Sequence, residues 1–305
     1  MDHIRFLKLI ADPRARSLQY RDVVRAYYDR ITAEYRARWG DSFHLPLLTD
    51  LQPLEQGILG AEQLIFLEGN LGPSMHILDV GCGIGGPTLN LAEMSGAEVT
   101  GVNVVERQVQ IARERAAARG LSGRVRFEVA DAMALPFPDA FFDAVVVFES
   151  GCYMPDKPHF YRECARVLRP GGRFLGIDWM AREGLDREAR VAYIEPICRI
   201  HAIADLIDLG QLQRYLDEAG LAIERCEDVT AWTGLTQAPA PSAEEQARAR
   251  AFGASADGGL PETSAWLRLG GVALRMGARA GAFIEGLWVA TRRVSSSTIE
   301  EPVGS

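Results

Sequence analysis

The sequence predicts an α/β protein in which helices cover both faces of a largely parallel sheet. Apolar, β-branched segments alternate with helical segments between residues 75 and 180, the pattern of parallel strands joined by crossover helices. The first apolar segment runs directly into a glycine-rich loop in "ILDVGCGIGG", residues 77–86. At 305 residues, the chain is long enough for one large domain or for one domain with a smaller cap.

The region before this alternation is predicted to be helical. Residues 17–38, which contain four tyrosines, and residues 51–69 are expected to form helices. Residues 39–48 carry Gly and Pro and are expected to connect the two. We assign residues 1–70 to an N-terminal helical cap.

The alternating region then supplies five strands. The expected strands are residues 75–81, 97–103, 124–131, 141–150 and 173–180. Between them, residues 87–96, 106–120 and 157–168 are expected to be helices, two of them stopped by Gly96 and Gly120. The sequence "PGG" at 170–172 predicts a turn before the fifth strand.

The C-terminal third continues the sheet and adds to the cap. Residues 206–219 and 265–282 are expected to be helices, and residues 221–229 and 284–293 strands. The Pro-, Ala- and Gly-rich segment 236–264 predicts a loop with one helix. We therefore expect a core over 71–293 with cap insertions near 183–205 and 236–282, and a disordered tail at 294–305.

Composition narrows the class of protein. The net charge of −8 and the scattered basic residues argue against a nucleic-acid partner. Five widely spaced cysteines form no Cys-x-x-Cys pair, so neither a disulfide framework nor a metal site is expected. No apolar run is long enough for a membrane span, and no secretory signal is apparent. We expect a cytoplasmic protein with free thiols.

The glycine loop by itself is ambiguous. Gly81, Gly83 and Gly86 fit the dinucleotide pattern Gly-x-Gly-x-x-Gly. However, Asp79 would repel a pyrophosphate at this point and is suited to an ammonium group instead. In addition, Asn103 ends the second strand, where a dinucleotide site usually has Asp or Glu. A nicotinamide enzyme and a fold that binds no nucleotide stay open at this point.

Further motifs carry a resemblance. In this order and spacing, "LDVGCGIGG", "DAMALPF", "FDAVVVFES" and "RVLRPGGRF" resemble class I S-adenosylmethionine-dependent methyltransferases over residues 75–180. The resemblance implies a Rossmann-like seven-stranded, mostly parallel sheet with an antiparallel last strand, and S-adenosyl-L-methionine as the cofactor. It also implies cofactor-binding roles for Asp79, Gly81, Gly83, Asn103, Gln108, Asp131 and Ala132.

Three more stretches point to a subgroup. Residues 27–45, 101–109 and 273–293 are similar to sterol and prenyl-diphosphate (terpene) C-methyltransferases. The expected substrate is an isoprenoid alkene, with a prenyl diphosphate placed ahead of a sterol. If the substrate is a diphosphate, Mg²⁺ is expected with it, although no carboxylate cluster identifies its ligands. The resemblance leaves a homo-oligomer open.

The chemistry of alkene methylation assigns the remaining candidates. Attack on the methyl group leaves a carbocation, which aromatic faces stabilise and which must then lose a proton to a base. Glu149 closes the fourth strand at the ligand-binding edge of the sheet and is the expected base. Tyr28 and Tyr153 are the expected aromatic residues, with Phe43 and Trp179 beside them. His44 is expected to touch cofactor or substrate.

Two alternatives stay open at this level. The first is O- or N-methylation of a polyketide or another small secondary metabolite, with His44 or His201 deprotonating a hydroxyl. The second is a protein that binds the cofactor without transferring its methyl group and uses the pocket for cyclisation or for binding. A structural role for Glu149 also stays open, since buried acids are often structural.

Overall fold

The computed structural model describes residues 1–47, 53–253 and 260–294. The tail expected to be disordered, apart from Val294, lies outside the described residues, as do residues 51 and 52 of the second predicted helix. No helix in the described ranges has the length and hydropathy needed to cross a bilayer.

The core is a seven-stranded sheet with the order β3-β2-β1-β4-β5-β7-β6. The first five strands run parallel, whereas β7 is antiparallel to both β5 and β6. This confirms the predicted fold class, including the antiparallel last strand. The strands are β1 (His76–Val80), β2 (Glu98–Asn103), β3 (Val125–Val129), β4 (Phe142–Phe148), β5 (Leu168–Ala181), β6 (Leu221–Asp228) and β7 (Phe283–Arg292).

Alternate residues of the central strands pack into two hydrophobic layers. Ile77 and Val146 belong to one cluster, while Leu78 and Val147 belong to the other. This period of two explains why the strands are apolar throughout, since both faces are covered. The covering helices are α4 (Leu54–Glu68), α5 (Gly86–Ser95) and α6 (Glu106–Ala118) on one face, and α7 (Lys157–Val167) and α10 (Leu209–Glu218) on the other.

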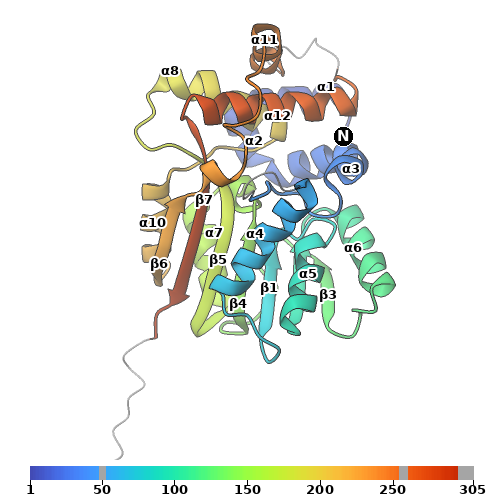
Figure 1. Ribbon diagram of the computed structural model, residues 1–305, viewed down its shortest axis with the longest axis vertical. Coiled ribbons are helices and arrows are strands. Elements are labelled where there is room, and N and C mark those ends of the chain that lie inside the picture. Colours follow the sequence, from blue (N-terminus) through green and yellow to red (C-terminus); the bar gives the residue numbers. More distant parts are fainter. Residues whose placement is uncertain (48–52, 254–259, 295–305) are drawn as a thin grey trace, which may run out of the picture.

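A layer of helices lies across the carboxyl ends of the parallel strands (Figure 1). Its members come from both ends of the chain: α1 (His3–Ala11), α2 (Pro13–Leu18), α3 (Tyr20–Trp39), α8 (Arg187–Ala189), a π-helical turn (Arg190–Ile194), α9 (Glu195–His201), α11 (Ala243–Ala251) and α12 (Thr263–Arg279). Trp266 of α12 packs against Phe6 and Tyr27, so the N- and C-terminal contributions share one core.

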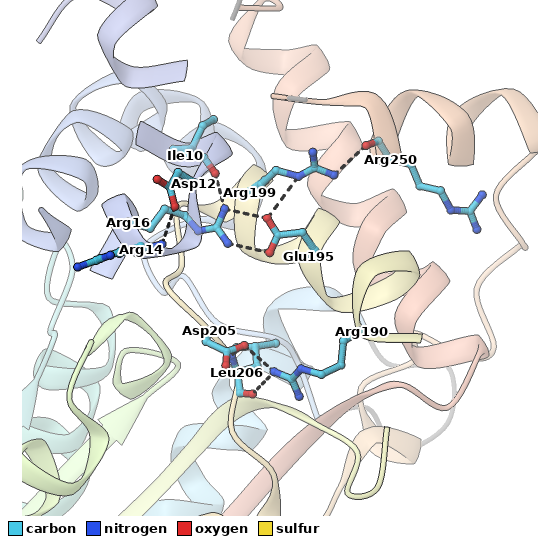
Figure 2. A network of polar contacts seen from close by, with 10 residues as sticks. All are labelled: Ile10, Asp12, Arg14, Arg16, Arg190, Glu195, Arg199, Asp205, Leu206 and Arg250. Carbon is cyan, nitrogen blue, oxygen red and sulfur yellow. Dashed lines mark hydrogen bonds and ion pairs between the residues drawn. The ribbon is translucent and has the colours of Figure 1, made fainter. Parts of the chain in front are cut away.

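A partly buried ion pair also joins these segments (Figure 2). The Arg16 guanidinium is fully buried and donates to both carboxylate oxygens of Glu195, at 3.0 and 2.8 Å. Arg199, one turn further along α9, in turn donates to the Arg250 carbonyl on α11. Because removal of one partner would leave a buried charge unpaired, this contact ties α2 firmly to α9.

Several element boundaries differ from those expected. Helix α1, which Asp2 caps by accepting from the Arg5 amide, was not expected at all. The helix predicted over 17–38 is divided at Gln19, whose backbone leaves the helical region. The "PGG" turn lies within β5: Leu168 pairs with Phe142 and Arg173 with Ala144, so residues 169–172 bulge out of the ladder.

The assignment of residues 1–70 to the cap stays a prediction. Within that range α3 contacts α12 of the helical layer, whereas α4 contacts α5 and β5 of the core.

Gly176 of β5 permits a close approach that supports the sheet. It pairs with Trp288 of β7, and a Cβ at position 176 would lie 2.1 Å from Trp288 Cζ2. Trp288 is fully buried among Phe174 and Tyr161 and cannot yield freely. We therefore expect Gly176→Ala to lower the free energy of unfolding by about 2–3 kcal/mol, measured by urea denaturation. Gly123→Ala, with open space around the added methyl group, should change it little.

Candidate functional site

A cavity of about 790 Å³, measured to include the solvent at its mouth, opens at the carboxyl edge of the sheet. Its floor is formed by the ends of β1, β2 and β4, and its roof by α3 and the loop 40–47. All of the site residues predicted from the sequence line this one cavity: Tyr28, His44, Asp79, Gly81, Gly83, Asn103, Gln108, Asp131, Ala132, Glu149 and Tyr153.

Asp79 lies at the end of β1 and is buried. Its Oδ2 accepts a hydrogen bond of 2.5 Å from Thr88 Oγ1 on α5. Burial raises the pKa of Asp79 to about 7, although the Thr88 hydrogen bond acts in the opposite direction. A buried carboxylate that forms no ion pair with a Lys or Arg among the described residues is suited to a cationic ligand group.

The loop after Asp79 requires glycine. Gly81 has a φ of +84°, and a Cβ there would lie 2.2 Å from Ser150 Cβ. Ser150 in turn donates from its hydroxyl to the Val80 carbonyl. The loop from β1 and the segment after β4 are therefore in direct contact, and a ligand resting on the first also approaches the second.

Asn103 is held in place by its neighbours. Its Nδ2 donates to Gln108 Oε1 at 2.8 Å, and its Oδ1 accepts from the Val105 amide. Gln108 Nε2 donates to Thr32 Oγ1 of α3 at 3.0 Å. Both ends of the Gln108 amide are thus engaged, so Gln108 lines the cavity mainly as the residue that orients Asn103.

The far end of the cavity contains Asp131 and Ala132. The Tyr20 hydroxyl, at the start of α3, donates to Asp131 Oδ1, and the Met133 amide donates to the same oxygen. Sequence analysis placed Tyr20 on a helix but gave it no role in the site. Its aromatic character was visible, but the contact joins segments more than 100 residues apart.

Glu149 stands where this cavity meets a second one. The second cavity, of about 420 Å³, lies between β5, α3 and α12, and shares Phe43, His44 and Glu149 with the first. Its other lining residues are largely apolar and aromatic: Tyr35, Trp39, Leu45, Trp179, His201, Leu267, Gly271 and Leu274.

The backbone and surroundings of Glu149 are unusual. Its φ of +47° lies in the left-handed region, which a non-glycine residue occupies only at an energetic cost. The Leu45 amide donates to Oε1. Burial raises the pKa of Glu149 well above its usual range, whereas the charge of His44 and the Leu45 amide act to lower it. Such a carboxyl group is suited to accept a proton near neutral pH.

The aromatic residues divide between site and core. Tyr28 and Tyr153 face each other, with hydroxyl oxygens 3.0 Å apart and ring centroids 5.8 Å apart. Tyr27 is fully buried, and its hydroxyl contacts His201 Nδ1 at 3.1 Å. Trp179 packs edge-on against His201 in the second cavity.

Comparisons with known proteins agree with this geometry. A family model described as a methyltransferase domain matches residues 78–176. The chain is 37% identical over 214 residues to Methyltransferase GfsG of Streptomyces halstedii, covering 69% of this chain and 76% of the relative. It is 39% identical over 197 residues to cycloartenol-C-24-methyltransferase 1 of Oryza sativa subsp. japonica, covering 64% and 55%. It is also 41% identical over 159 residues to 27-O-demethylrifamycin SV methyltransferase of Amycolatopsis mediterranei, covering 52% and 58%.

The chain thus spans little more than half the length of the last two relatives. Among solved structures, the [4+2]-cyclase SpnF matches with a TM-score of 0.70 and 27% identity, covering 89% of this chain and 95% of that one. Geranyl diphosphate methyltransferase in complex with GPP and sinefungin shares the fold, with a TM-score of 0.72, 20% identity and coverage of 90% and 99%. Together, the matched domain and the well-covered relative show that the chain belongs to the class I S-adenosylmethionine-dependent methyltransferases.

Proposed function

We propose that the chain methylates a carbon of a neutral, isoprenoid-type alkene, with Glu149 as the base that takes the released proton. The observation that carries this proposal is the position of Glu149. It lies at the junction of a cavity with cofactor-binding features and a largely apolar, aromatic cavity. Several curated relatives are named as sterol or cycloartenol C-24-methyltransferases, which supports carbon as the acceptor.

The first cavity fits S-adenosylmethionine by its chemistry. Asp79 would hold the ammonium group, the loop at Gly81 and Gly83 would lie against the methionine portion, and Asn103 would bind the ribose hydroxyls. Asp131 and Ala132 would flank the adenine. When bound, the cofactor supplies an electrophilic methyl group on a sulfonium centre.

The residues at the junction would then act in sequence. Transfer of the cofactor's methyl group to the alkene would leave a carbocation on the substrate. The rings of Tyr28 and Tyr153 line the cofactor side of this junction and can stabilise positive charge. Glu149 removes a proton from the adjacent carbon, which restores the double bond and neutralises the product.

The charge of the lining favours a neutral substrate over the prenyl diphosphate expected from the sequence. Among the described residues that line the two cavities, none is Lys or Arg, whereas four are Asp or Glu: Asp41, Asp79, Asp131 and Glu149. A diphosphate would therefore meet Asp79 and Glu149 with no Lys or Arg on the described lining, whereas Asp41 and Asp131 are paired with arginines behind it. Within the described ranges, no three His, Cys, Asp or Glu side chains form a group suited to a metal ion.

Methylation of a polyketide hydroxyl is the second candidate, supported by the 27-O-demethylrifamycin relative. His201 also lines the second cavity, but Glu149 is better suited than either histidine to act as the base. His44 has both ring nitrogens against acceptors. His201 Nδ1 contacts Tyr27, and burial lowers its pKa to about 4. Glu149 would have to deprotonate the hydroxyl in this case too.

The test uses methyl-labelled S-adenosylmethionine and a panel of acceptors. The panel contains a Δ24 sterol, an acyclic terpenoid alcohol, geranyl diphosphate with and without EDTA, and a phenolic polyketide. Label on an isoprenoid carbon supports the proposal, and label on oxygen establishes the second candidate. Labelling of geranyl diphosphate that is lost with EDTA would show instead that the substrate is a prenyl diphosphate. Cyclised product without S-adenosylhomocysteine would match the activity named for SpnF.

Tyr153 offers a test of the carbocation. Replacement by Leu removes an aromatic face whose interaction with the carbocation contributes about 0.5–2 kcal/mol. Turnover should therefore fall by roughly 2- to 30-fold. Tyr153→Phe keeps the ring and loses only the hydroxyl contact with Tyr28, so its turnover should stay near that of the parent. Single-turnover rates would measure both, and equal losses in the two variants would contradict an aromatic role.

A further inference from the structure

Glu62 is a buried acid that sequence analysis did not single out. It lies on α4 and is fully buried. Its Oε1 accepts from Ser42 Oγ at 2.6 Å and contacts His44 Nε2 at 3.3 Å, while its Oε2 accepts from Asn90 Nδ2 at 2.5 Å. Two donors, from Ser42 and Asn90, and one ring nitrogen of His44 therefore surround the Glu62 carboxyl group.

His44 is held between two acceptors. Its Nε2 faces Glu62, and its Nδ1 lies 3.0 Å from the Leu45 carbonyl oxygen. A neutral imidazole has a proton on one nitrogen alone. The lone pair of its other nitrogen would then face an acceptor oxygen, which is unfavourable. Both contacts are satisfied when the ring carries two protons and a positive charge. Burial acts to lower the pKa of His44, but the hydrogen bond and charge of Glu62 outweigh it and raise the pKa.

A continuous path leads from this pair to the proposed base. His44 and Glu149 line both cavities, and the residue after His44 donates its amide to Glu149 Oε1. The positive charge of His44 acts to lower the pKa of Glu149. Other titratable groups on the neighbouring elements lie near His44 or Glu149. They are Asp178 of β5, Glu285 of β7, Asp79 of β1, and Tyr28 and Tyr35 of α3.

None of these other groups places a positive charge beside Glu149. The charges of Asp178 and Glu285 disfavour ionisation of Glu149, and the phenols carry no positive charge. His44 is thus the cation that the described surroundings set beside Glu149.

We propose that Glu62 is a positioning residue that holds His44 as an imidazolium and thereby favours the ionised form of Glu149 that removes the proton. The inference rests on the proposed function only in taking Glu149 as the base. It also gives α4 a part in the reaction, although Glu62 lines neither cavity.

The experiment compares Glu62→Gln with the parent enzyme by two readouts. The first is NMR of ¹⁵N-labelled histidine, which reports the protons on the His44 ring without any turnover. We expect two ring protons at pH 7 in the parent and one in the variant. The second readout is the pH profile of kcat. Its acid limb should move upward by about one pH unit, with activity recovering at high pH.

Matched variants separate this role from a structural one. Glu55→Gln makes the same change at an exposed position of α4 and should leave both readouts unchanged. His44→Gln should reproduce the shift of the acid limb with Glu62 intact, and this carries the test if Glu62→Gln does not fold. In the His44→Gln background, adding Glu62→Gln should shift the limb no further.

Two results would overturn the proposal. One is an imidazolium that persists at His44 in Glu62→Gln. The other is a loss of turnover in that variant that is equal at every pH. Failure of the proposed function looks different: Glu149→Gln would then turn over like the parent, while the His44 spectrum would still decide whether Glu62 holds the ring proton.

Discussion

Glu149→Gln lowers kcat by a factor of about 100 or more, while the dissociation constant for S-adenosylmethionine changes less than about twofold. Gln has the shape of Glu and keeps an oxygen that can accept from the Leu45 amide. It lacks a basic oxygen, so the carbocation has no acceptor for its proton. The measurement pairs single-turnover kinetics with calorimetric binding of the cofactor.

The stability of this variant provides its control. Because burial raises the pKa of Glu149, the native state holds this proton at pH values where the unfolded chain has released it. The contribution of Glu149 to stability is therefore largest at acid pH and declines as pH rises toward the native pKa. Gln does not titrate and makes no pH-dependent contribution to stability. The Tm of the variant should therefore rise relative to that of the parent as pH increases. Inactivity with a lower Tm would point to misfolding, and full activity would rule out the base.

Asp79→Asn is expected to weaken cofactor binding by roughly 30- to 150-fold, as loss of a buried charge-assisted contact of about 2–3 kcal/mol implies. The carboxylate lies at the end of β1, beside the glycine loop, and is the group suited to the cofactor ammonium. Calorimetry with S-adenosylhomocysteine would measure the loss. Asp29→Asn, at an exposed position of α3, should bind like the parent.

The pH dependence of binding gives the same residue a second signature. The pKa of Asp79 is about 7 in the free protein, and the proton must leave before a cation binds. Affinity should therefore be constant above pH 7 and fall toward tenfold per pH unit below it. Asp79→Asn should lose this dependence. A parent whose affinity is flat from pH 5.5 to 8.5 would contradict the assignment.

The core could be predicted from the sequence because each element carries its own signal. Strands β1, β2 and β4 are short apolar runs that end in Asp79, Asn103 and Glu149. In a parallel sheet, residues at strand ends meet at one edge, so their convergence followed from the fold class alone. The antiparallel β7 came from the resemblance, since its apolar composition does not encode direction.

Other features depend on contacts between distant segments. Glu62 looks like an ordinary helix-surface acid, and only Ser42, His44 and Asn90 reveal its burial. Tyr20 acquires its role from Asp131. These two roles arise from tertiary packing, on which local propensity is silent. Helix α1, in contrast, carries a local signal that the prediction missed, since its apolar residues gather on one buried side and Asp2 caps it.

The wall shared by the two cavities couples their ligands thermodynamically. Phe43, His44 and Glu149 face both spaces, so whatever fills one space orders the side chains that the other must use. The free energy of this coupling is a property of the ternary complex and acts equally in both directions. An acceptor that tightens cofactor binding tenfold is itself bound tenfold more tightly in return. Selectivity for the acceptor is therefore expressed partly as affinity for the cofactor, and a poor acceptor leaves the enzyme with a weaker hold on its methyl donor.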